Sequence, residues 1–492
     1  MLLSFAARAI FIHFLGVKYL GVSSLFTNII SFLSLAELGV GAALTFHMYA
    51  PLAAGDKEKL TSIIMLYKKL YTKIGLFILV AGVCLLPSLK YIVNTHLNMK
   101  EVYIFYIMYL IDSVISYFYV YKTTIITADQ KDYKIKQYKL LMTVIKFVIQ
   151  SLMLVIFKNF IAYLIVQIVA TFTTNVYISY KATNLYPYIN EKRNIDKSLE
   201  KKIWKTIRAS FLYNLGGVII NNEDNILISK LVSTDMIGYC SNYTMIFHAF
   251  KNITNIIFSS LIPSVGNLYA ESKKEHSFEV FEMIMQMSYC IYGIITILIC
   301  VCSQDFIRLW LGNKYVLSQA IVLAMAMDFY SGNRVIAVQI YRNATGLFEK
   351  IKYLLFITSI INLILSILLG MKLGIFGIYI ATTLSRIVTN LWFEPIQLYK
   401  LFQKNVKTYF MKRIVEDLFM LLALCICLFI SSKIVMANSL MSLLIKGLIC
   451  AFIYGTIMIV FFSNRKEYKS LTEIFKREIN KIRKGKKSCT HI

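Results

Sequence analysis

Residues 8 to 44 read RAIFIHFLGVKYLGVSSLFTNIISFLSLAELGVGAAL, and two charges, Arg8 and Glu37, stand inside its apolar segments, whereas Lys18 lies in the connection between them. Arg8 and Glu37 lie in segments that are apolar enough to form membrane-spanning helices. A charge at the centre of such a helix costs about 2.5–3.5 kcal/mol on insertion scales. The stretch therefore predicts membrane helices whose few charges face one another or water. It favours a polar path through a membrane over a soluble enzyme.

The composition of the whole chain agrees with a membrane protein. Of the 492 residues, 58% are hydrophobic, whereas soluble domains contain about 45–50% apolar residues. The formal net charge is +27, but the basic residues lie in short connections between apolar segments. Such connections are typical of cytoplasmic loops rather than of a nucleic-acid-binding domain. The nine cysteines form no CxxC pattern, and we expect no metal site.

Fourteen apolar segments of spanning length follow one another along the chain. The predicted spans are residues 1–15, 20–49, 72–93, 101–127, 138–157, 159–181, 207–231, 236–263, 283–303, 317–344, 353–371, 373–398, 413–433 and 439–462. Lys and Arg are concentrated in the connections after even-numbered spans, as at Lys57, Lys131 and Lys201, and in the tail. Both termini are therefore predicted to be cytoplasmic.

The sequence also partly repeats itself with a shift of about 216 residues. This shift places Asp112 on Asp328 and Arg8 on Asp224, and a shift of 217 places Gly21 on Gly238. Because each half then contains six spans, an even number, the halves share one orientation, as in parallel-repeat transporters.

The repeat predicts an all-α polytopic membrane protein with two parallel six-helix bundles and two additional C-terminal helices. The predicted bundles are residues 1–183 and 207–398, joined by a cytoplasmic linker, 184–206. Residues 399–463 hold the two additional helices, and 464–492 form a basic cytoplasmic tail.

This layout resembles the multidrug/oligosaccharidyl-lipid/polysaccharide (MOP) exporter superfamily, which includes the MATE transporters. The stretch from Arg8 to Leu44 and its continuation MYAPLAAGDKEKLTSII, residues 48–64, resemble the start of Wzx-type repeat-unit flippases. ITADQKDY at 126–133, DNILIS at 224–229 and IGYCSNY at 237–243 resemble later parts of the same family. The resemblance implies a substrate of undecaprenyl-pyrophosphate-linked oligosaccharide, moved from the inner to the outer leaflet.

A pyrophosphate inside a membrane needs cations or helix N-termini as partners. The candidate cations of a central cavity are Arg8, Lys146, Lys251, Arg334 and Arg386. Each also has a structural interpretation, because Lys146 could snorkel to a loop and others could pair internally. Polar side chains that could meet the sugars are Tyr213, Asn214, Asn221, Asn222 and Asn225, with Gln150, Gln167 and Asn175 as weaker candidates.

Five carboxylates are candidates for ion coupling or for pairing with these cations. They are Glu37, Asp112, Glu223, Asp224 and Asp328. A buried carboxylate can carry a proton, whereas one beside a cation is structural. The sequence leaves both roles open. For Glu37, followed by Gly39 and Gly41, it predicts a kink or a close helix contact.

The leading hypothesis is a flippase of the bacterial cytoplasmic membrane that serves surface polysaccharide biosynthesis by alternating access. The alternatives are an ion-coupled small-molecule or multidrug antiporter of the same superfamily, or a peptidoglycan lipid-precursor flippase. A phosphate-binding GxxxxGK[ST] motif, HExxH and GxSxG are absent, so we expect a transporter rather than an enzyme. We expect no cofactor, with coupling to H⁺ or Na⁺ left open. The expected partners are the lipid-linked oligosaccharide, membrane lipids, a polysaccharide polymerase and glycosyltransferases, and no nucleic acid.

Overall fold

The computed structural model describes residues 2–129, 131–191, 193, 195–271, 274–345, 347, 351, 353–434, 440–466 and 468, and these residues are predominantly helical. Contacts divide the chain into two compact units. Unit 1 comprises Met1–Ser241 and Leu355–Ile378, and unit 2 comprises Asn242–Leu354 and Tyr379–Ile492. This division joins residues 355–378 to unit 1, so it differs from the predicted bundles 1–183 and 207–398. Those boundaries rest on the sequence repeat and stay a prediction.

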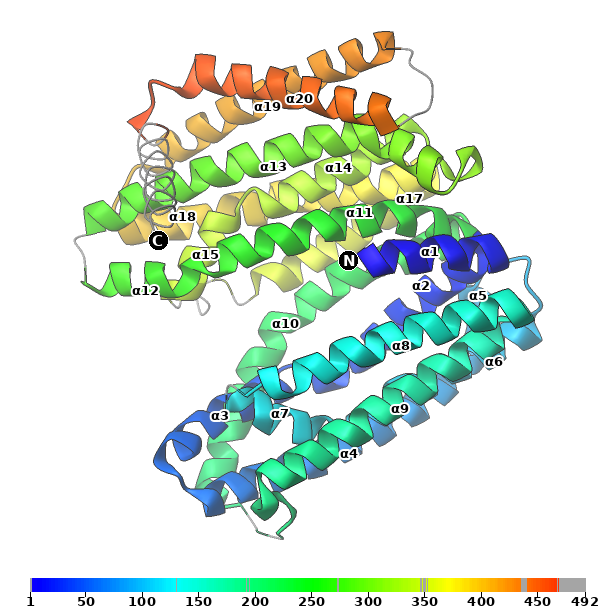
Figure 1. Cartoon of the computed structure of the whole chain (residues 1–492). Helices are drawn as coiled ribbons and strands as arrows, with labels where there is room; N and C mark the ends of the chain where they lie inside the picture. The colour runs from blue at the N-terminus through cyan, green and yellow to red at the C-terminus, as the bar shows by residue number, and fades with distance from the viewer. Residues whose placement is uncertain are drawn as a thin grey trace, which may run out of the picture. The chain divides into compact units, whose positions relative to one another are not determined.

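Unit 1 is built from long helices joined by short connections (Figure 1). Its elements are α1 (Leu2–Leu15), α2 (Val17–Leu33), η1 (Ser34–Glu37), α3 (Val40–Ala54), α4 (Lys57–Leu85), η2 (Leu86–Ser88), α5 (Leu89–Ile92), α6 (Met99–Tyr117), α7 (Val120–Ala128), α8 (Tyr133–Phe157), α9 (Phe160–Leu185), η3 (Pro187–Asn190) and α10 (Lys197–Leu231). Side-chain oxygens cap several of these helices, which satisfies N–H groups that a helix start leaves free. Asp56, for example, accepts from the Lys59 amide at 2.9 Å.

Two predicted spans of unit 1 are interrupted. The segment 20–49 contains α2 and α3, and the chain leaves helical geometry between them at Leu38 and Gly39, where φ of Gly39 is 82°. Glycine adopts such a positive φ without a steric penalty. The segment 101–127 contains α6 and α7, which are bent by 48° relative to each other. The break at Leu38 and Gly39 confirms the kink that the sequence predicts near Glu37.

Two helices contribute to both units. These are α11 (Thr234–Ser259) and α17 (Leu354–Val388). The other elements of unit 2 are α12 (Leu261–Glu271), α13 (Lys274–Trp310), η4 (Asn313–Tyr315), α14 (Gln319–Asn333), α15 (Ile336–Thr345), α18 (Asn390–Phe402), α19 (Val406–Lys433) and α20 (Leu440–Phe462). The core of unit 2 lies around α13, which packs against α14, α15, α19 and α20. In Figure 1, α19 and α20 lie side by side, in agreement with their contacts.

Among the described residues, ten helical stretches are long and apolar enough to cross a membrane, and eleven if the bent pair α6–α7 counts as one span. The sequence predicted fourteen. The difference arises because α1 has 14 residues, because α10 is not among the ten, and because one stretch, Leu354–Phe402, covers two predicted spans. Gly374, with φ 61° and ψ −138°, breaks the helix within that stretch. The all-helical polytopic class is confirmed, and the count of fourteen stays a prediction.

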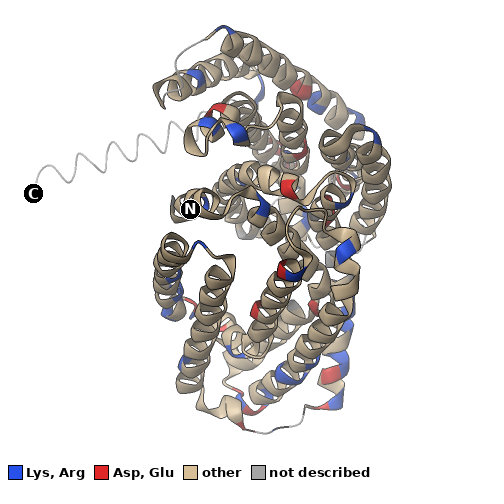
Figure 2. Cartoon of the chain, turned by 90° about the vertical axis from the view of Figure 1, so that its right-hand side faces the viewer, with Lys and Arg blue, Asp and Glu red and all other residues tan. Residues whose placement is uncertain are grey.

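Charged residues are sparse on these helices. Figure 2 shows long ribbons of uncharged residues, with Lys, Arg, Asp and Glu scattered among them. Because charges are expensive inside a membrane, the side chains that lie within the apolar helices are the natural place to look for a functional site.

Candidate functional site: buried charges of the two units

A cluster of one carboxylate and two cations lies inside unit 2. Arg386 of α17 donates from Nη1 to the Asp328 carboxylate at 2.5 Å and to the Asp328 backbone carbonyl at 2.8 Å. Lys251 of α11 interacts electrostatically with both of these side chains. Among the described residues, no carboxylate oxygen lies within ion-pair distance of Lys251. The three side chains together carry one excess positive charge, so the cluster can attract an anion.

Gly332 of α14 leaves the space that the Arg386 guanidinium occupies. A Cβ built on Gly332 would lie 2.6 Å from Arg386 Nη1 and 3.1 Å from its Cζ. Only glycine lets the guanidinium lie this close to the helix backbone, where it reaches Asp328 one turn earlier. His248, three residues before Lys251 on α11, also interacts electrostatically with Lys251. The predicted residues Lys251, Asp328 and Arg386 are thus brought together.

Arg334 lies in a different environment from this cluster. It forms an ion pair with Asp417 of α19, and the Tyr330 hydroxyl donates to the same carboxylate at 2.9 Å. The Arg334 side chain is 14% exposed. Its charge is therefore balanced by Asp417, which was not among the carboxylates predicted from the sequence, whereas Lys251 has no carboxylate partner among the described residues.

Unit 2 also contains a network of buried ion pairs that was not predicted from the sequence. Arg413 of α19 pairs with Glu282 of α13 at 3.3 Å and with Glu416 at 2.7 Å, and Arg465 pairs with Glu416 at 2.7 Å. Glu282 and Glu416 are 3% and 1% exposed. The spacing of Arg413 and Glu416, one helical turn apart at the start of the predicted span 413–433, was the available signal. The network links α19 to α13 within unit 2.

Arg8 and Asp112 belong to a polar group in unit 1. Arg8 donates to the Ser241 hydroxyl at 2.8 Å, and Gln167 donates to the Asp112 carboxylate at 2.8 Å. The other Asp112 oxygen has no hydrogen-bond partner among the described residues. Tyr109 interacts electrostatically with both Arg8 and Asp112. The group therefore contains one cation and one carboxylate, in contrast to the cationic excess of the unit 2 cluster.

Glu223 lies on α10 in unit 1 and is 3% exposed. The Asn362 amide donates to one of its carboxylate oxygens, and the second oxygen has no hydrogen-bond partner among the described residues. Ser366 donates to Asn362 at 3.3 Å. Its neighbour Asp224 is half-buried. Glu223 therefore stands in a fully buried amide and hydroxyl environment, without an ion pair to a cation of the described residues.

Of the other predicted site residues, some make hydrogen bonds within the protein, and some have side chains that lie outside the described residues. Gln150 donates to the Tyr163 carbonyl at 3.2 Å, and Asn175 donates to Ser116 at 3.3 Å. Lys146 is half-buried on α8, without an ion pair to the described residues, and Asn222 donates to the Val218 carbonyl at 2.7 Å. The side chains of Tyr213, Asn214 and Asn221 lie outside the described residues, and Asn225 is half-buried.

The start of α10 carries an exposed basic face. Lys197, Lys201, Trp204, Lys205 and Arg208 are exposed and line a groove of about 1010 Å³. Their spacing places them on one side of the helix. Ile203 and Ile207 are buried, and α10 packs against α3. Such a face attracts anionic head groups.

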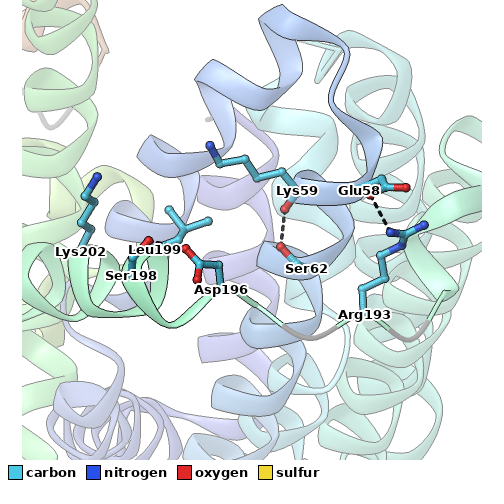
Figure 3. A pocket seen from close by; sticks show the side chains of 8 residues that line it. All are labelled: Glu58, Lys59, Ser62, Arg193, Asp196, Ser198, Leu199 and Lys202. Atoms are coloured by element: carbon cyan, nitrogen blue, oxygen red, sulfur yellow. Dashed lines mark hydrogen bonds and ion pairs between the residues drawn. The ribbon is translucent and has the colours of Figure 1, made fainter.

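Next to the basic face lies a smaller groove of about 310 Å³. Figure 3 shows its lining side chains, which come from the start of α4, from Arg193 and from the start of α10. Arg193 pairs with Glu58 at 2.8 Å, and Ser62 donates to the Lys59 carbonyl at 2.7 Å. Because Glu58 and Asp196 offset two of its three basic side chains, this groove has less capacity for an anion than the basic face.

No family model matches the chain, and no curated protein matches it. Solved structures do. The lipid II flippase MurJ in an inward closed conformation is similar at TM-score 0.71 and 14% identity, over 94% of this chain and 97% of that one. An inward-facing MATE multidrug resistance transporter of the MOP superfamily is similar at TM-score 0.65 and 14% identity, over 80% and 94%.

The chain has the fold of MOP superfamily transporters. A MOP superfamily transporter from Pyrococcus furiosus, with a binding pocket of reversed polarity, is also similar, at TM-score 0.54 and 15% identity over 81% of this chain and 92% of that one. These proteins are described as transporters and flippases, and the chain shares their multi-pass membrane fold. The expectation of a transporter fold is confirmed at this level.

Proposed function

We propose that this protein is a flippase for undecaprenyl-pyrophosphate-linked oligosaccharide repeat units. It moves them from the inner to the outer leaflet of the bacterial cytoplasmic membrane for surface polysaccharide biosynthesis. Transport proceeds by alternating access between two parallel six-helix bundles, with fourteen spans and both termini in the cytoplasm. A polysaccharide polymerase and glycosyltransferases supply and use the substrate.

The observation that carries the proposal is the excess positive charge of the cluster formed by Lys251, Asp328 and Arg386. A cation that lacks a carboxylate partner inside apolar helices is costly, and an anionic substrate removes that cost. Asp328 orients the Arg386 guanidinium, and Lys251 supplies the second positive charge. A pyrophosphate between the two cations accepts charge-assisted hydrogen bonds from both. Arg8 of unit 1 is the next candidate, because it too has no ion pair to a carboxylate of the described residues.

The basic face of α10 is a second observation in favour of a phosphate-bearing lipid substrate, which would arrive from the cytoplasmic leaflet. Basic side chains near a membrane surface gain about 1 kcal/mol each from anionic lipids, and Trp204, which is 40% exposed, is a residue that membrane interfaces favour. Lys201 and Lys205 lie one turn apart on this face. They raise the local concentration of phosphate-bearing lipids where transport begins.

Deletion of the gene in its native host tests the proposal. We expect surface polysaccharide to disappear and lipid-linked repeat units to accumulate on the cytoplasmic side, and a plasmid copy to reverse both effects. Lys251→Ala should fail to complement, whereas Lys407→Ala, a change at an exposed lysine in the first turn of α19, should complement fully. Normal polysaccharide in the deletion strain, together with altered drug tolerance, would instead support the multidrug antiporter.

A second candidate function is favoured by one comparison. The similar structure with TM-score 0.71 is that of a lipid II flippase and covers 94% of this chain. Lipid II also carries a pyrophosphate on a polyprenyl chain, so the same cations could bind it. Rescue of a strain depleted of its lipid II flippase, without any change in surface polysaccharide upon deletion of this gene, would favour that substrate.

A further inference from the structure

The backbone of unit 1 leaves helical geometry directly after Glu37. The acid is the last residue of η1, where α2 has tightened into a 3₁₀ turn. Leu38 follows with ψ 122°, and Gly39 with φ 82° begins the turn into α3. Non-helical backbone at membrane depth is tolerated only where protein or a water-filled cavity covers it. The break therefore places a carboxylate beside backbone groups that no longer belong to a continuous helix.

Three tyrosines surround this break. Glu37 interacts electrostatically with Tyr67 and Tyr71 of α4 and with Tyr117 of α6. The Tyr67 and Tyr71 rings are stacked, with centroids 4.5 Å apart, and Tyr71 and Tyr117 are stacked at 6.0 Å. A Cβ built on Gly41 would lie 2.9 Å from the Tyr71 hydroxyl and 3.3 Å from the Tyr67 hydroxyl. Both hydroxyls thus reach the first turn of α3.

Two short chains of hydroxyl groups begin at these tyrosines. The Tyr117 hydroxyl donates to Ser34 at 2.9 Å. The Thr124 hydroxyl of α7 lies 3.1 Å from the Tyr67 hydroxyl, to which it can donate. Hydroxyl groups both donate and accept hydrogen bonds, so they can pass a proton along such a chain.

Glu37 has no cationic partner in the part of the chain that the structure describes. No Lys or Arg of the described residues forms an ion pair with it. Of the nearby helices, α7 brings Lys122, which donates to Thr183 at 3.1 Å. The helix α10, which packs on α2 and α3, brings Arg208 and Glu223, and neither pairs with Glu37. A half-buried carboxylate without a cationic partner has a desolvation cost that a bound proton removes.

We propose that Glu37 is the proton-coupling group of this transporter, and that the hydroxyls of Tyr67, Tyr71 and Tyr117 connect it to the proton source. In the coupling step, the carboxylate accepts one proton through the hydroxyl chain and becomes a neutral carboxylic acid. It later releases that proton as a carboxylate, so no other bond changes. The proposal rests on the transport function proposed above, but proton binding by Glu37 can be measured without any transport.

A proton suits this site better than a metal ion. The site offers one carboxylate, three phenol hydroxyls and the hydroxyls of Ser34 and Thr124, and the phenol rings are stacked. A sodium ion needs several oxygens converging on one point, whereas a proton needs a single oxygen and a hydrogen-bond partner. Neutral Glu37 accepts and donates within the hydroxyl chain, whereas ionised Glu37 only accepts. The helix break at Leu38 and Gly39 lets α2 and α3 respond to that change.

Infrared difference spectroscopy of the purified full-length protein tests this directly. Between pH 8 and pH 5, the wild type should gain a protonated carboxyl band that Glu37→Gln lacks. Glu58→Gln, a change at a 73% exposed glutamate, should keep the band. Tyr71→Phe and Tyr117→Phe retain the acid and should each shift the pH midpoint of the band, which keeps the test decisive if Glu37→Gln does not fold. An unchanged band in Glu37→Gln, or unchanged midpoints in both phenylalanine variants, would overturn the proposal.

A sodium titration separates the two ions. At fixed pH, NaCl and choline chloride should stabilise the wild type against thermal unfolding equally. Stabilisation by NaCl alone that disappears in Glu37→Gln would overturn the assignment to a proton. If the band behaves as expected but a pH gradient moves no lipid-linked substrate in proteoliposomes, the flippase proposal fails and proton binding by Glu37 stands.

Discussion

Gly21 of α2 and Gly238 of α11 meet at a helix crossing within unit 1 that has no room for a side chain. A Cβ built on Gly21 would lie 2.2 Å from the Thr234 carbonyl oxygen, and one on Gly238 would lie 2.4 Å from the Val17 carbonyl oxygen. Small residues at such crossings let membrane helices approach closely. The repeat predicted from the sequence, with a shift of 217 residues, also places Gly21 on Gly238.

Substitution of either glycine should separate α2 from α11. Overpacking a tight contact costs about 1–3 kcal/mol per site, so Gly21→Ala and Gly238→Ala should each lower the melting temperature of the purified protein. Gly455→Ala is the matched control, because a Cβ there meets no atom within 4 Å. Equal melting temperatures for all three variants would mean that the crossing is looser than the geometry indicates.

The ion pair between Arg334 and Asp417 should stabilise the packing of α14 against α19 and so raise the free energy of unfolding. Removal of one partner of a buried pair costs about 3–5 kcal/mol, and we expect the lower end because the Asp417 side chain is 31% exposed. A double-mutant cycle of Arg334→Ala and Asp417→Ala, followed by chemical unfolding, measures their coupling. The double variant should be more stable than the sum of the single changes predicts. Additive losses would show that the pair contributes nothing.

The ion pair of Asp129 with Lys131, in the connection between α7 and α8, should make stability depend on pH. Burial raises the pKa of the Asp129 carboxyl, but hydrogen bonds from Lys131 and Tyr186 outweigh it, so the net pKa lies below its usual range. The Tyr186 hydroxyl donates to Asp129 at 2.5 Å. A carboxyl whose folded pKa is lowered stabilises the protein above the unfolded pKa of about 3.9. This stability is lost as pH falls through the folded value.

The wild type should therefore melt at a higher temperature than Asp129→Asn at pH 7. The difference should shrink as the buffer is acidified below about pH 4, where the carboxyl is protonated in the unfolded chain. Asp132→Asn, three residues along in the same connection, is the comparison variant. A difference that does not change with pH would mean that the charge of Asp129 has no part in the contact.

Much of the architecture could be predicted from the sequence because membrane helices leave a strong pattern. Apolar length located the helices, and the break at Glu37 followed from the glycines after the acid. The pairing of Asp328 with Arg386 was less accessible. Both residues stand in apolar segments 58 positions apart, and only tertiary structure brings them within hydrogen-bond distance.

The ion pairs of Arg413 and the tyrosines around Glu37 could not be predicted from the sequence, because tertiary packing brings these residues together. Arg413 was predicted to begin the span 413–433, but α19 begins at Val406, so Arg413 lies two turns inside the helix and is 4% exposed. A helix boundary predicted a few residues late was enough to hide its partners Glu282 and Glu416. The tyrosines around Glu37 could not be distinguished in the sequence from the many tyrosines that a membrane interface contains.

The most direct test of the central claim is a flipping assay with the purified protein in liposomes. The substrate is a fluorescent undecaprenyl-pyrophosphate oligosaccharide, and an impermeant quencher reports the fraction in the outer leaflet. Wild-type protein and Lys407→Ala should equilibrate the two leaflets, whereas Lys251→Ala and Arg386→Ala should slow equilibration at least about tenfold, equivalent to about 1.4 kcal/mol. Equal rates for all four proteins, or no movement by the wild type, would contradict the account.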